Sequence, residues 1–126
     1  MGQQQLLITI LVTIIIGVAT VIAINTMRSS RADANKASVR QDILMVLNDA
    51  QIYYRKSKMM GGGGNSFDGI SPNNIVSLDP ENENGTYTIS GSGNTVTVDG
   101  TGTVKGVTLT ATATMTNNGM EISWSD

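Results

Sequence analysis

The feature that most constrains this chain is an apolar run close to its N-terminus. Nineteen residues, from Leu6 to Ile24, contain no charged side chain, and the first charge after them is Arg28. As an α-helix this run is about 28 Å long, which is close to the hydrocarbon thickness of a bilayer. A helix that is apolar on every face must be buried in lipid or in protein. The run therefore predicts a membrane anchor, or the core of an assembly built from many copies.

A cleaved secretory signal is a poorer interpretation of the same run. Such a signal has a basic region before a shorter apolar stretch, and a small-residue cleavage site after it. No Lys or Arg precedes Leu6, and the apolar pattern does not stop cleanly at Ile24. We therefore expect the run to be retained in the working protein.

Beyond the run, apolar residues recur at steps of three and four, as along one stripe of a helix. They are Val39, Ile43, Val46, Leu47, Ala50 and Tyr54. No glycine lies between Gly17 and Gly61, and the first proline is Pro72, so no strong helix breaker intervenes. We predict one helix over about residues 3–58, roughly 80 Å long. The glycines Gly61–Gly64 are interpreted as its cap, followed by a flexible linker.

The period changes to two from Thr86 onward, which is typical of half-buried strands. Segments 86–90, 94–100, 104–115 and 119–125 are separated by GSGN, GTGT and TNNG, which suit tight hairpins. The apolar face that they predict consists of Tyr87, Ile89, Val96, Val98, Val107, Leu109, Ala111, Ala113, Met115, Met120, Ile122 and Trp124. The opposite face is largely Thr and Ser. The predicted fold is therefore α+β, with the long helix packed under a four-stranded antiparallel β-meander.

The intervening segment is rich in turn residues and acids. Five apolar side chains are expected to hold it against the core: Phe67, Ile70, Ile75, Val76 and Leu78. Its acids, Asp68, Asp79, Glu81 and Glu83, lack the spacing of an EF-hand and are interpreted as a solvated loop rather than a calcium site. Asn84-Gly85-Thr86 matches a glycosylation sequon, with an ordinary turn as the alternative. The chain thus divides into an apolar helix (1–27), an amphipathic half (28–60), a loop (61–85) and a sheet (86–126).

The composition argues against catalysis. The sequence contains no Cys and no His, the residues that most often bind metals and transfer protons. We therefore expect no enzyme activity, no metal and no cofactor. Arg55, Lys56 and Lys58 end the predicted helix, where the helix dipole favours cations, so nucleic-acid binding is not expected.

The net charge of −2 conceals an asymmetry along the chain. Residues 28–58 carry seven basic and three acidic side chains, whereas residues 59–126 carry one basic and seven acidic ones. Two solvated surfaces would explain this pattern. Attraction between the acidic head of one copy and the basic stalk of another would explain it equally well.

The segment QLLITILVTIIIGVATVIAIN, Gln5 to Asn25, resembles the apolar N-terminus of type IV pilins, and the predicted layout resembles their whole fold. The resemblance implies a filament subunit whose apolar helices polymerise with one another. The implied filament core comprises Leu6, Leu7, Ile8, Ile10, Leu11, Ile14, Ile15, Val18, Val21 and Ile22. Met1 and Gln5 would make the N-terminal assembly contact. The implied partners are further copies of the chain, the membrane before assembly, and the pilus assembly machinery.

The sequence departs from the family pattern at three points. Gln5 stands where most pilins carry a glutamate, the usual proline near the end of the apolar segment is missing, and no basic leader is visible before Met1. Met1 is then either the mature N-terminus left after a leader is removed, or the start of a chain made without one. Without the proline, melting of the helix in a filament is less expected, although Gly17 would permit it.

Two functions of different classes follow. The first is a structural subunit of an extracellular type IV pilus-like filament, held in the cytoplasmic membrane before assembly and serving adhesion, motility or surface contact. The alternative is a minor pseudopilin or a single-pass membrane-anchored binding protein. Arg28, Arg31, Lys36 and Arg40 follow the apolar run closely, and such charges favour a cytoplasmic head unless a basic leader precedes Met1. This charge distribution supports the alternative.

Overall fold

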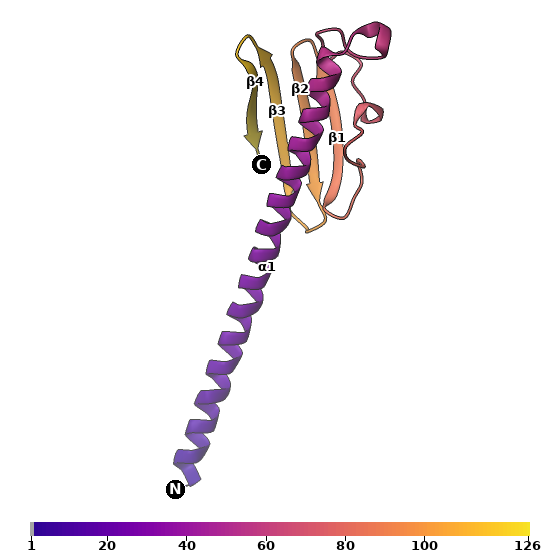
Figure 1. The fold of residues 1–126 in the computed structure, drawn as a ribbon. Helices are drawn as coiled ribbons and strands as arrows, with labels where there is room; N and C mark the ends of the chain where they lie inside the picture. The colour runs from indigo at the N-terminus through magenta and orange to yellow at the C-terminus, as the bar shows by residue number, and fades with distance from the viewer. Residues whose placement is uncertain (1) are drawn as a thin grey trace.

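One helix extends through almost the whole length of the molecule and carries a small sheet at its far end (Figure 1). The computed structural model describes residues 2–126. Helix α1 spans Gly2–Arg55, and its first half stands free of the rest of the chain. This confirms the predicted α+β fold, in which the long helix packs against the sheet only through its second half.

Helix α1 ends at Arg55, three residues earlier than the predicted boundary, because the glycine loop folds back on it. The amides of Gly62, Gly63 and Gly64 donate to the carbonyls of Ser57, Tyr53 and Lys56 at 2.8–2.9 Å. A Cβ at Gly63 would lie 1.8 Å from the Ser66 carbonyl oxygen, so only glycine fits there. The predicted cap is therefore confirmed, and the predicted flexibility of the segment that follows it stays a prediction.

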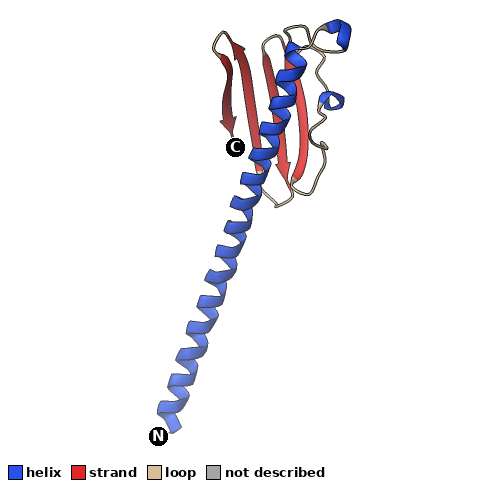
Figure 2. Cartoon of the chain, in the orientation of Figure 1, coloured by secondary structure: helices blue, strands red, loops and turns tan. Residues whose placement is uncertain are grey.

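Two short 3-10 helices, η1 (Lys58–Met60) and η2 (Pro72–Asn74), lie in the long connection between helix and sheet. This connection runs down one flank of the sheet, beside its first strand (Figure 2). Glu81 makes an isolated antiparallel bridge to Thr86, so the connection covers part of that sheet edge.

The sheet is the predicted antiparallel meander, with strands in sequence order. Its strands are β1 (Gly85–Ser92), β2 (Thr95–Gly102), β3 (Thr108–Thr116) and β4 (Gly119–Ser125). The β2–β3 connection lies at residues 103–107 rather than at GTGT. Gly106 adopts φ +87° in that turn, where glycine meets no steric penalty.

The core lies between α1 and the middle of the sheet. The stripe residues Val39, Ile43, Val46, Leu47 and Ala50 are fully buried, as the spacing predicts. They pack against Val96 and Val98 of β2 and Leu109, Ala111 and Ala113 of β3. A Cβ on Gly100 would lie 2.8 Å from Val39 Cγ1, so the helix approaches β2 most closely where that strand has no side chain.

Two apolar residues predicted to lie in the core are exposed. Val76 is 84% exposed, because its amide turns inward to bond Asp49 and its side chain points to solvent. Ile122 is 37% exposed, because α1 lies over β2 and β3 and leaves β4 uncovered. The other predicted loop anchors, Phe67, Ile70 and Ile75, are buried, and Leu78 is partly buried.

Candidate functional site: the bare helix and its polar anchor

The apolar segment of α1 has no protein around it. The ten predicted filament-core residues are all exposed in a single copy, by between 50% and 66%. They are Leu6, Leu7, Ile8, Ile10, Leu11, Ile14, Ile15, Val18, Val21 and Ile22. Because these residues occupy every face of the helix, a single copy cannot bury them all against its own head.

The hydroxyl groups within this segment are satisfied by the helix itself. The side chains of Thr9, Thr13 and Thr20 donate to the carbonyls four residues earlier, each at 2.8 Å, and Thr26 does the same at 3.0 Å. A hydroxyl paired in this way presents mainly its methyl group to the surroundings. The segment is therefore more apolar as a surface than its three threonines suggest.

The segment meets the length and hydropathy expected of a membrane-spanning helix, with a mean hydropathy of 2.9 over its most apolar window. No other helix among residues 2–126 meets both criteria. An exposed apolar helix of this kind suggests association with a membrane or with secretion. A protein assembly of the same helices would provide the same apolar environment.

Three sequence expectations concern the start and middle of this segment. Gln5 lies in the opening turns of α1 and is exposed, and its carbonyl accepts the Thr9 hydroxyl. Met1 lies outside the described residues, so its proposed assembly contact stays a prediction. The helix continues unbroken through Gly17, where a Cβ would meet no atom within 4 Å.

The second half of α1 carries a row of polar side chains at intervals of seven residues. Asn35, Asp42 and Asp49 lie two helical turns apart from one another, beside the buried apolar stripe. All three bind the long connection or the β2–β3 loop through hydrogen bonds. We call them the polar row.

Asp42 holds the turn that leads into β1. Its Oδ2 accepts the Tyr87 hydroxyl at 2.6 Å and the side-chain amides of Asn84 and Asn82 at 2.9 and 3.2 Å. Burial of the tyrosine, the hydrogen bond to Asp42 and the negative charge of that carboxylate together raise the pKa of Tyr87 well above its ordinary value. The Asn84 side chain, the predicted glycosylation site, is half-buried and bonded to this carboxylate. Its glycosylation stays a prediction.

Asp49 and Asn35 bind neighbouring loops, one nearer the C-terminal end of α1 and the other nearer its N-terminal end. The two carboxylate oxygens of Asp49 accept the amides of Val76 and Ser77 and the Ser77 hydroxyl, at 2.7–3.1 Å. The Asn35 side chain donates to the Asn84 carbonyl at 2.9 Å and accepts the Val104 amide at 3.2 Å. Buried carboxylates satisfied by several donors fix the loop in one arrangement.

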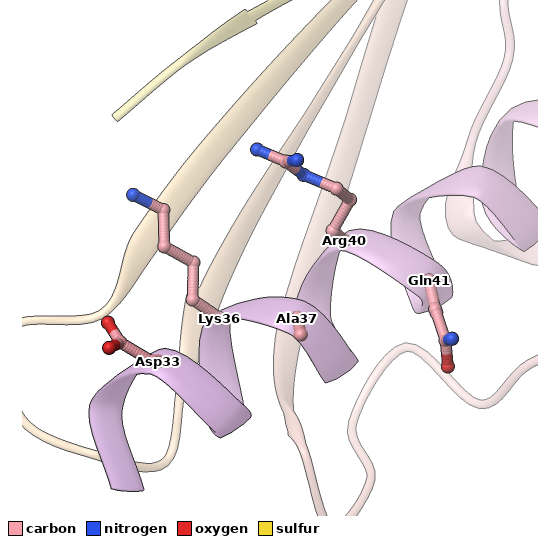
Figure 3. A pocket seen from close by; sticks show the side chains of 5 residues that line it. All are labelled: Asp33, Lys36, Ala37, Arg40 and Gln41. Carbon is pink, nitrogen blue, oxygen red and sulfur yellow. The ribbon is translucent and has the colours of Figure 1, made fainter. Parts of the chain in front are cut away.

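The open flank beside β4 is held by charged groups. Lys36 Nζ lies 2.6 Å from Asp126 Oδ2, and the Arg40 guanidinium lies over the Trp124 ring at 5.1 Å from its centroid. Figure 3 shows Asp33, Lys36, Ala37, Arg40 and Gln41 along the wall of the adjoining surface groove, with Lys36 and Arg40 extended toward the sheet. These contacts tie the C-terminal strand to α1 without burying it.

The acids of the connection do not gather into a metal site. Among residues 2–126, no group of three or more His, Cys, Asp or Glu side chains is placed to hold a metal ion. Asp68 instead accepts the Gly93 amide at 2.9 Å, and Asp79 accepts the Glu81 amide at 3.2 Å. These carboxylates stabilise turns.

The polar row is what sequence reasoning missed. Asp42 and Asp49 are counted above only as charges of the basic stalk, yet both are buried. The signal that could have found them is the seven-residue spacing from Asn35, on one side of the apolar stripe. Polar residues in register beside a buried stripe indicate a bonded partner, because burial without one is costly.

No protein-family model, no curated protein and no solved structure matches this chain. The long apolar N-terminal helix packed against a four-stranded antiparallel sheet is a pilin-like architecture. That architecture and the exposed apolar surface are therefore the basis for assigning a function.

Proposed function

We propose that this chain is a structural subunit of an extracellular, type IV pilus-like helical filament. The observation that carries the proposal is the all-round exposure of residues 6–24 on a rigid helix that projects from a folded head. Before assembly, acyl chains of the cytoplasmic membrane solvate this segment. On leaving the membrane, it is buried against the same segment of other copies.

The energetics favour such an assembly. Burying one Leu, Ile or Val side chain contributes roughly 1.5–3 kcal/mol, and this segment offers many of them per copy. Parallel helices joined by heterologous contacts give an open helical polymer when the rotation between neighbouring copies does not close on itself. In this role the subunit performs no chemistry and needs no cofactor, and its partners are other copies, the membrane and the pilus assembly machinery.

A second candidate is a minor pseudopilin or a single-pass anchored protein whose head binds a partner. The cations Arg28, Arg31, Lys36 and Arg40 favour the anchored protein, because basic residues beside a spanning helix tend to stay on the cytoplasmic side. Protease treatment of intact cells separates the filament subunit from an anchored protein with a cytoplasmic head. Cleavage of the head from outside supports the filament subunit, and protection supports a cytoplasmic head.

The proposal is tested by Ile14→Asp with Ile15→Asp, which places two charges in the centre of the apolar segment. We expect this variant to yield no filaments in the sheared fraction, as seen by electron microscopy, while the head keeps its circular dichroism spectrum. Asn117→Asp with Asn118→Asp adds the same charge at the exposed β3–β4 turn and serves as the matched control. Normal filaments from the Ile14 and Ile15 variant would refute the proposal.

A further inference from the structure

The far end of the head presents an exposed surface that combines apolar and basic side chains. Met59 and Met60 of η1 are 99% and 70% exposed. Arg55, Lys56 and Lys58 precede them closely in the chain and are also exposed. Within residues 2–126 the single salt bridge joins Lys36 to Asp126, so these three cations have no ionic partner in their own copy. We call these five residues the tip.

The tip is held in a fixed shape. The Gly61 amide donates to the Lys58 carbonyl at 3.1 Å, and the Asn65 amide donates to the Tyr54 carbonyl at 2.6 Å. Together with the glycine cap, these bonds leave Met59 and Met60 projecting from an ordered turn. Large apolar side chains held in water by an ordered backbone indicate an interaction surface.

An acidic surface of opposite charge lies lower on the same molecule. Asp79, Glu81 and Glu83 are exposed on the connection beside β1 and form no ion pair among the described residues. Their neighbours Asn82 and Asn84 are bonded to Asp42, so this surface, the acidic turn, is also fixed in place.

The tip and the acidic turn cannot pair within one copy. Asp42, which holds the acidic turn, lies thirteen residues before Arg55, which ends α1 and belongs to the tip; this is a separation of about 20 Å along the helix axis. A second copy displaced along that axis by roughly this distance brings its acidic turn to the level of the first copy's tip. Parallel apolar segments of about 28 Å still overlap after such a displacement.

We propose that the tip of one copy docks against the acidic turn of a second, axially displaced copy. This inference rests on the proposed filament and adds a second, electrostatic contact between heads. The two surfaces differ, so the contact is heterologous and can repeat without closing. Opposite charges across it would set the register in which the apolar helices pack.

Zero-length carbodiimide cross-linking of the full chain tests this contact, because the reagent joins a lysine amine only to a carboxylate that touches it. We expect a ladder of covalent multimers from filaments or membranes. Mass spectrometry should find Lys56 or Lys58 joined to Asp79, Glu81 or Glu83. The Lys36–Asp126 pair within one copy is an internal control for the reaction. Lys56→Arg with Lys58→Arg keeps the charges but removes the amines, so it should lose these links and keep the filaments.

Charge exchange supplies an independent measurement. Lys56→Glu with Lys58→Glu, or Glu81→Lys with Glu83→Lys, should each reduce filament yield at least about tenfold, because like charges then face one another. The four substitutions combined in one chain should restore the yield. No restoration, or filaments that give the Lys36–Asp126 link without a ladder, would overturn the head contact while leaving the filament proposal standing. A ladder through the tip in membranes that form no filaments would support the contact and contradict the filament.

Discussion

The two halves of helix α1 have different surroundings, although the helix is continuous: the first half is exposed, and the second half packs against the head. In the first half every side chain is exposed and every hydroxyl is satisfied by the helix itself. In the second half a buried stripe and the polar row have specific partners on the sheet and the long connection. The second half is therefore complete within one copy, whereas the first half acquires its surroundings only in lipid or in an assembly.

Among these variants, the largest loss of head stability is expected from substitution of Asp42. Asp42→Ala leaves the Tyr87 hydroxyl and two asparagine amides without their acceptor, which costs about 3 kcal/mol of head stability. In a head of this size that corresponds to a fall in Tm of more than about 10 °C, measured by thermal circular dichroism. Asp33→Ala, at an exposed position of the same helix, should change little. Equal Tm values for the two variants would contradict the structural role of the polar row.

Gly17 lies in the first half of α1, and Gly63 lies in the cap that follows its second half, so substitutions at these two glycines compare the two regions. At Gly63 an added Cβ meets a backbone oxygen at 1.8 Å, so Gly63→Ala should destabilise the head by roughly 1–3 kcal/mol. At Gly17 it meets nothing, so Gly17→Ala should leave the Tm of the head unchanged and favour the helix by about 1 kcal/mol. Urea titration of both variants checks this difference. A destabilised head in Gly17→Ala would show that the apolar half is coupled to the head.

Alkaline pH should lower the free energy of unfolding of the head, because Tyr87 is protonated in the folded state. Its pKa is raised in the folded state, so the folded head keeps the proton at pH values where the unfolded chain loses it. The resulting stabilisation is fully present below the ordinary tyrosine pKa of 10.0 and is lost progressively as the pH rises above it. Tyr87→Phe should be less stable at neutral pH and should fall less steeply above pH 10, as followed by urea titration. Parallel pH profiles for the two proteins would contradict this role of Tyr87.

The smallest effect is expected on the open flank. The side chains of Lys36 and Asp126 are 37% and 67% exposed, so Lys36→Ala should cost less than about 1 kcal/mol, and less still at high salt. Urea titration at low and high ionic strength measures this difference. A loss as large as that of Asp42→Ala would mean that β4 depends on the ion pair for its place in the sheet.

Periodicity alone was sufficient to predict the helix, its buried stripe from Val39 to Ala50, and the four-stranded meander. These features repeat at fixed intervals, so their pattern is local. The same pattern could not place Val76 or Ile122, because their exposure depends on where the connection turns and on which strands the helix covers. The glycine cap was predicted, but the need for glycine at position 63 was not, since it is imposed by the Ser66 carbonyl, which only the folded chain brings near.

The candidate site divides in the same way. The apolar segment was predicted from its composition, and all ten of its named residues are exposed. Their role as a filament core stays a prediction. The polar row depends on partners up to 45 residues away along the chain, such as Tyr87 for Asp42. The sequence carries the spacing of this row but does not identify its partners.

Electron cryo-microscopy of material sheared from cells that make this chain tests the central claim most directly. We predict thin, regular fibres whose core is a bundle of the helical segments up to residue 25, with the heads outside. Dispersed single copies that remain in the membrane fraction, with no fibres, would contradict the account and leave the apolar half of α1 as an anchor.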